Sequence, residues 1–223
     1  MSRLPPSPEP PMHDQFSDPA LARALLPHAF DKRDGAHDEA HLLRVWRNAL
    51  KIQAGEGGDL RILLAATLLH DCIWVDKASP ERPRASRMAA EKAREVLAAL
   101  DWDGAEIDRV AHAIEAHSYS AAIPPETLEA RILQDADRLD AMGFIGVARC
   151  LWLAGARGAV ICHATDPAAA GRPLDDAAHA LDHFQTKLLG LGDGLTTATG
   201  RRLAETRAAR LRAFYDGLLE ELG

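Results

Sequence analysis

The stretch DLRILLAATLLHDC, residues 59–72, decides the fold. It starts at Asp59, a residue type that caps helix N-termini, and is then apolar on nearly all sides. A helix that is apolar all round belongs in the core of a protein. The stretch ends in His70 and Asp71, so an imidazole and a carboxylate follow directly on the most apolar part of the chain. We predict a central, buried helix over residues 59–72.

The segments on either side of this stretch also have helical periodicity. Over residues 37–54, apolar residues recur with a period of 3.6, and a run of glycines then ends the pattern. No window alternates with a period of two. We predict an all-α protein with about eight helices around one core. The further helices are expected over about 19–30, 84–100, 104–117, a stretch after Pro124-Pro125 that Gly143 and Gly146 bend or break, 175–190 and 195–221.

The composition is typical of one globular domain. The 223 residues are 47% hydrophobic and 26% charged, and few are aromatic. Prolines crowd the first eighteen residues, and proline removes amide donors that a packed segment needs. We predict a disordered tail over residues 1–18 and a single helical domain over 19–223. Three tryptophans are expected to be core or helix-packing residues: Trp46, Trp102 and Trp152.

Charge and cysteine content exclude several classes of function. The formal net charge is -7, whereas a nucleic-acid-binding surface is normally basic. No run of 18 or more apolar residues and no signal peptide are visible, so we expect no membrane partner. The three cysteines form no CxxC pair, which favours a reducing, cytoplasmic location. Small phosphorylated ligands remain compatible with this composition, and homodimer formation stays open.

Two other segments offer the same chemistry as His70-Asp71. His41 lies on the helix expected over 37–54, and the run DADRLDA sets Asp135, Asp137 and Asp140 among apolar residues. Burying a carboxylate without a partner is costly, and a metal cation would satisfy imidazoles and carboxylates together. Asp137 and Asp140 are three apart and lie roughly on one helix face, whereas Asp135 lies off that face. Because these acidic residues are interleaved with apolar ones, at least one of them should point inward.

The order of these residues resembles the HD phosphohydrolase superfamily, and within it a subgroup of small bacterial HD hydrolases. The resemblance covers about residues 25–220. It rests on four ordered blocks: HDxxHxxRV at residues 37–45, LLHD at 68–71, DADRLDAxG at 135–143 and HFxxKLLxL at 183–191.

The resemblance implies a metal site within a core of about residues 37–143. The family's ligands fall on His41, His70, Asp71 and Asp137. Mixed nitrogen and oxygen ligands suit manganese, our first choice, with magnesium, cobalt, nickel and iron as alternatives. The implied activity is hydrolysis of nucleotides or small phosphate esters by metal-activated water. Cleavage of nucleoside triphosphates to monophosphate and pyrophosphate is the leading reaction, and simple phosphomonoester cleavage is its rival.

Catalytic roles beyond the ligands are expected near the His-Asp pair. Asp71 is itself expected to act in catalysis, and Lys77 either binds phosphate or is a solvated surface lysine. Asp76 is a candidate for proton transfer. Some relatives carry an acidic residue three positions after the pair, where this chain has Trp74. This departure leaves the acid-base role unassigned.

Four further residues are candidates for substrate binding. Arg44 and Arg138 either hold phosphate or pair with acidic residues near the metal. His117 either contacts substrate or caps its own helix. Lys187, in the last family block, is expected to help close the pocket together with His183.

A function of another class also fits the sequence. A non-catalytic nucleotide-binding or regulatory HD module would keep the fold without turnover, and the missing acidic residue at Trp74 keeps this alternative open. The complete ligand set favours an enzyme, because a binding module has no need of all four ligands.

Overall fold

The computed structural model describes residues 10–32, 35–75 and 79–223. Throughout these residues the regular structure is helical, apart from isolated bridge residues such as the pair Val160 and His179, so the all-α prediction is confirmed. The α-helices are α1 (Pro19–Leu25), α2 (Glu39–Glu56), α3 (Leu60–Leu69), α4 (Ala85–Ala98), α5 (Gly104–His117), α6 (Leu128–Asp140), α7 (Gly143–Ala156), α8 (Ala180–Thr186) and α9 (Ala198–Leu222). Short 3-10 helices cover Met12–Gln15, Leu26–His28, Arg82–Arg84 and Leu188–Gly194.

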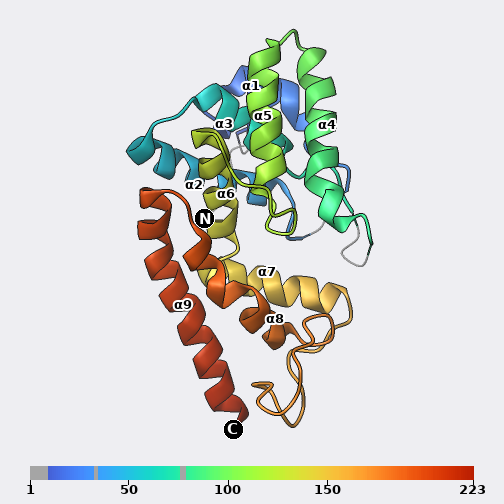
Figure 1. Ribbon diagram of the computed structural model, residues 1–223, viewed down its shortest axis with the longest axis vertical. Coiled ribbons are helices and arrows are strands. Elements are labelled where there is room, and N and C mark those ends of the chain that lie inside the picture. Colours follow the sequence, from blue (N-terminus) through green and yellow to red (C-terminus); the bar gives the residue numbers. More distant parts are fainter. Residues whose placement is uncertain (1–9, 33–34, 76–78) are drawn as a thin grey trace, which may run out of the picture.

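Helix α3 is the centre of the fold, as its sequence predicts. Every residue from Ile62 to Leu69 is buried, and α3 packs against α1, α2, α4, α5 and α6. Figure 1 shows α1 to α6 gathered in one half of the molecule and α7, α8 and α9 in the other. The first turns of α9 reach back to α2 and α6 and join the two halves.

Short polar side chains fix where most of the helices begin. A side-chain oxygen of the residue before each helix accepts a hydrogen bond from an amide of the first turn, which would otherwise have no partner. These capping residues are Asp18, Asp38, Asp59, Asp103, Thr127 and Thr197.

A sharp bend separates α6 from α7, so the long helix expected after Pro124-Pro125 is two helices. The axes of α6 and α7 differ by 71°. Gly143 has φ +65, which favours glycine, and a Cβ on Gly146 would lie 2.2 Å from the carbonyl oxygen of Ala141. In the described chain no single helix is long and apolar enough to cross a membrane; α6 and α7 meet that test of length and composition only as a bent pair.

Part of the proline-rich segment is packed, contrary to the predicted disordered tail. Residues 1–9 lie outside the described part, but Met12–Gln15 form a 3-10 helix. The Phe16 side chain is buried, with its ring 6.3 Å from that of Trp46. A large aromatic ring gains enough from burial to order the residues beside it.

Two other expectations are corrected. The helix expected over 175–190 is α-helical only from Ala180 to Thr186, because the Asp175 side chain accepts from the amides of Ala177 and Ala178 and forms a turn there. Trp152 is 58% exposed rather than a core residue, whereas Trp46 and Trp102 are buried. Trp152 lies on the outward face of α7, where its ring packs against the backbone of Gly35.

Asp135 ties the N-terminus of α9 to α6. Its carboxylate is fully buried and accepts hydrogen bonds from the amides of Thr196 and Thr197, and from the Thr197 hydroxyl at 2.7 Å. Asp135 therefore points toward the start of α9, off the helix face that carries Asp137.

Replacing Asp135 by Ala should therefore loosen the junction of the two halves. The substitution leaves buried amides without an acceptor, and we expect a loss of about 3 kcal/mol in the free energy of unfolding. Urea denaturation measures this loss. The metal content of the purified variant should stay at the wild-type level, and a fall in metal content would contradict the purely structural role.

Candidate metal centre

His41 enters the site from the first turn of α2. The Asp38 carboxylate accepts from the His41 amide at 2.9 Å, which starts the helix at Glu39 and points the imidazole inward. The ring is 1% exposed, and its Nδ1 lies 2.8 Å from Oδ2 of Asp140. A carboxylate accepts from Nδ1–H, so the opposite nitrogen, Nε2, is left to face the site.

His70 enters from the C-terminal end of α3. Its Nδ1 donates to the carbonyl oxygen of Thr67 at 2.8 Å, the acceptor that the amide of residue 71 would use if the helix continued. This competition explains why α3 ends at Leu69 and not at Cys72. The side chain is buried, and its Nε2 lies 3.2 Å from Nε2 of His41.

Two carboxylates complete the cluster. Asp71 Oδ2 lies 3.6 Å from Nε2 of His41 and 3.4 Å from Nε2 of His70. Asp137 Oδ1 lies 3.7 Å and 4.0 Å from the same two atoms. The structure therefore brings the four residues of the family's ligand set together. The imidazoles are buried while the carboxylates are 32% and 28% exposed, so the cluster is open on the carboxylate side.

The chemistry of this donor set fits a divalent cation. Both Nδ1 atoms are used as donors, so two neutral imidazoles would point bare Nε2 lone pairs at each other across 3.2 Å. A cation or a proton between them removes the repulsion. Burial lowers the pKa of His70 to about 4, whereas for His41 the carboxylates of Asp140 and Asp71 outweigh burial and raise the pKa to about 8. Ligand atoms of His41, His70 and Asp71 lie within 4.8 Å of one another.

Asp140 is a functional residue whose role the sequence left open. Its carboxylate is 1% exposed and bonds to His41, to Arg44 at 2.7 and 3.1 Å, and to Arg149 at 2.8 Å. Burial opposes ionisation, but the hydrogen bonds from His41 and Arg44 hold the pKa of Asp140 well below its usual value. The visible signal was its position three residues after Asp137. Arg149, on α7, carried no such signal.

His117 lies beside the cluster and caps its own helix, which is one of the two roles considered for it. Its Nδ1 donates to the carbonyl oxygen of Ile114 at 2.6 Å near the end of α5, and its Nε2 lies 3.7 Å from Oδ1 of Asp71. The ring also meets that of His70 edge-on at 4.9 Å. Burial works against charge here, yet the contact with Asp71 raises the pKa of His117 above its usual value.

The two arginine candidates both contact other parts of the protein. Arg44 is paired with Asp140, which is the second of the two roles considered for it. Arg138 donates to the carbonyl oxygen of Gly194 and lies over the Tyr119 ring. Both guanidinium groups are therefore engaged with the protein itself. Asp76 and Lys77 lie outside the described residues.

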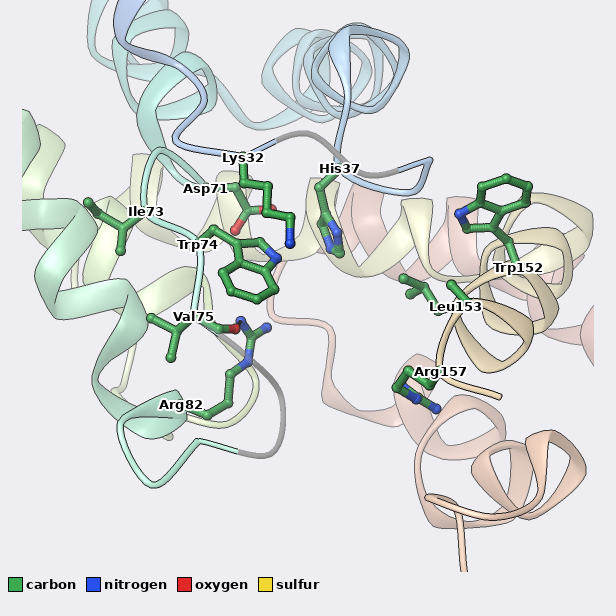
Figure 2. Close-up of a pocket in the computed structure, with 11 residues that line it drawn as sticks. Lys32, His37, Asp71, Ile73, Trp74, Val75, Arg82, Trp152, Leu153 and Arg157 are labelled. Atoms are coloured by element: carbon green, nitrogen blue, oxygen red, sulfur yellow. Dashed lines mark hydrogen bonds between the residues drawn. The ribbon is translucent and has the colours of Figure 1, made fainter. Parts of the chain in front are cut away.

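Two cavities meet at the cluster. The first, of about 310 Å³, is the aromatic lobe; six of its lining residues are Lys32, Ile73, Trp74, Val75, Trp152 and Ala156. The second, of about 440 Å³, is the cationic lobe, and Arg149 and Lys187 line it together with His117, His183 and Tyr119. Both lobes are also lined by His37, Asp71, Arg82, Leu153 and Arg157. Figure 2 shows the aromatic lobe, with Asp71 and His37 at its inner end.

Lys187 and His183 both reach the cationic lobe, as expected from the last family block. Lys187 Nζ lies 5.1 Å from the centroid of the Tyr119 ring. Burial lowers its pKa below the usual value, while Asp137 acts in the opposite direction. His183 Nδ1 lies 2.9 Å from the Asp176 carboxylate, a contact that orients the ring. His37, which lines both lobes, meets His41 edge-on at 5.7 Å.

Comparison with known proteins identifies the family that has this arrangement. The model of the HD domain matches residues 39–142, the segment that contains all four residues of the cluster. YpgQ of Bacillus subtilis is 35% identical over 175 residues, which are 77% of each chain. The chain belongs to the HD superfamily.

Solved HD structures agree over nearly the whole chain. The structure of YpgQ in complex with ADP is 30% identical, covers 91% of this chain and 96% of its own, and superposes with a TM-score of 0.66. An HD-superfamily hydrolase from Bacillus thuringiensis is 28% identical, with the same two coverages and a TM-score of 0.66. HD domains bind divalent metals, and the fold is that of metal-dependent phosphohydrolases in general.

Proposed function

We propose that this HD protein is a cytoplasmic hydrolase that cleaves nucleoside triphosphates to a monophosphate and pyrophosphate. The observation that carries the proposal is the position of Asp71, which lines both lobes and belongs to the metal cluster between them. YpgQ, the relative solved with ADP, supports a ligand of the nucleotide type.

The arrangement of the lobes favours this reaction over its rival. Cleavage between the α- and β-phosphates places the reacting phosphorus in the middle of the substrate, with the nucleoside on one side and two phosphates on the other. A cluster between an aromatic and a cationic lobe suits such a substrate at both ends. Cleavage of a terminal phosphate needs room for a large group on one side only.

The cluster residues have distinct tasks in this proposal. His41, His70, Asp71 and Asp137 would hold the divalent cation, with manganese as our first choice. A cation there supplies Lewis acidity, which lowers the pKa of water and polarises a phosphoryl oxygen. Asp140 keeps the His41 ring in its orientation. Lys187 and Arg157 of the cationic lobe offer donors to phosphate oxygens that gain charge.

Product analysis tests the proposal. Purified protein with Mn²⁺ should convert ATP or GTP to monophosphate and pyrophosphate, and one oxygen from ¹⁸O-labelled water should appear in the products of a single turnover. Inorganic phosphate as the first product would favour the monoesterase. Nucleotide binding without any hydrolysis would favour the non-catalytic module.

A further inference from the structure

We propose that the aromatic lobe is the nucleobase subsite, with Trp74 as its stacking surface and Lys32 as a hydrogen-bond donor that selects bases with a keto oxygen. This inference rests on the proposed function, because it assigns the nucleoside half of the substrate to one lobe and the phosphates to the other.

Trp74 has the position that a stacking residue needs. It follows Asp71 by three residues, so the chain between them spans at most about 11 Å, and a base on the indole stays within reach of the cluster. The indole lines the lobe and Trp74 is 38% exposed, although a large aromatic side chain is normally buried. A flat aromatic surface open to a cavity is a sequence-tolerant platform for a base.

The side of the lobe across from the indole is apolar apart from Arg157. Leu153 and Ala156 of α7 line it, and Figure 2 shows Leu153 across the opening from the Trp74 indole. Ile73 and Val75 flank the tryptophan on its own segment. These apolar side chains suit a planar, weakly solvated ring, and two of the cations that line this lobe, Arg82 and Arg157, line the cationic lobe as well.

The polar groups of the lobe explain the proposed selectivity. Six residues line this lobe and not the cationic one: Lys32, Ile73, Trp74, Val75, Trp152 and Ala156. Their side chains carry hydrogen-bond donors and no acceptor. Lys32 Nζ lies over the face of the Trp74 ring, 4.2 Å from its centroid. A base that stacks on this face displaces the ammonium group, which then lies beside the edge of the base. A donor there favours a keto oxygen over an exocyclic amino group.

Equilibrium binding of nucleoside monophosphates tests the stacking surface. These molecules have no phosphoanhydride bond, so the proposed reaction does not consume them during calorimetry with Mn²⁺. Trp74→Ala and Trp74→Leu should each weaken binding of inosine monophosphate about tenfold. Binding of ribose 5-phosphate, which lacks a base, should not change. The control variant is Phe144→Ala, which removes an exposed aromatic side chain of α7. It should bind both probes like the wild type. Unchanged inosine monophosphate affinity in the Trp74 variants would overturn the assignment.

Two matched pairs of probes test the selectivity. Inosine monophosphate should bind more tightly than adenosine monophosphate, and uridine monophosphate more tightly than cytidine monophosphate, by about fivefold in each pair. Lys32→Met should abolish both differences. Equal affinities in the wild type, or a preference that survives Lys32→Met, would contradict the role of Lys32.

The outcomes separate this inference from the proposed function. If the wild type cleaves triphosphates while the Trp74 variants bind every probe normally, the subsite is wrong and the reaction stands. If the probes bind as expected but no triphosphate is hydrolysed, the reaction is wrong and the subsite stands.

Discussion

Protein in which Asp71 is replaced by Ala should contain almost no divalent metal and should lose at least about 1000-fold of its phosphohydrolase activity. The reason is geometric. Asp71 Oδ2 lies within 3.6 Å of both buried Nε2 atoms, and the same carboxylate approaches His117. No carboxylate of α3 or α6 contacts all three of these imidazoles. Metal content by mass spectrometry and steady-state hydrolysis are the two measurements.

The fold of this variant should survive, because Asp71 follows the end of α3 and is 32% exposed. Circular dichroism of the purified protein would show this. Asp216→Asn, at an exposed position on α9, is the matched control and should keep wild-type metal content and activity. An Asp71→Ala protein with full turnover would show that the active site lies elsewhere.

Replacing Asp140 by Ala should have the largest effect on stability. The buried carboxylate balances Arg44 and Arg149 and holds the His41 ring, and its removal leaves like charges together beside the site. Breaking such a buried network by removing one partner costs about 3–5 kcal/mol. Urea denaturation should show this loss.

The same variant should also bind metal about 10–100-fold more weakly, because the partner of a ligating histidine fixes its tautomer and orientation. Asp140 is thus a positioning residue. Asp135→Ala is the matched control, since it removes another buried carboxylate of α6 but is expected to leave metal affinity alone. Loss of stability with unchanged metal affinity in Asp140→Ala would limit Asp140 to a structural role.

The helices were predictable because their causes are local. The apolar composition of α3, the capping residue Asp59 and the two glycines at the start of α7 act on their own segments and are visible in the sequence. The packing of Phe16 and the exposure of Trp152 were not predictable. Both depend on which surface another segment covers, and an apolar residue alone does not state its partner.

The features of the site likewise fall into those that the sequence predicted and those that only the structure showed. His41, His70, Asp71 and Asp137 were found through the family resemblance, and the structure brings these four side chains together. For Arg44 the sequence left two roles open, phosphate binding and pairing with an acidic residue. Its pairing with Asp140 became visible only when α2 was packed on α6, since the two residues are 96 positions apart.

The order of polar and apolar residues by itself determined that this chain is helical, that α3 is its centre, and which residue types can hold a cation. Tertiary structure alone decided that Asp140 and Arg149 support His41, and that Asp71 stands between an aromatic and a cationic lobe. The physical reason is the range of the forces involved. Helix formation and capping act over a few residues, whereas charge pairing and cavity shape depend on distances that exist only after distant segments have packed.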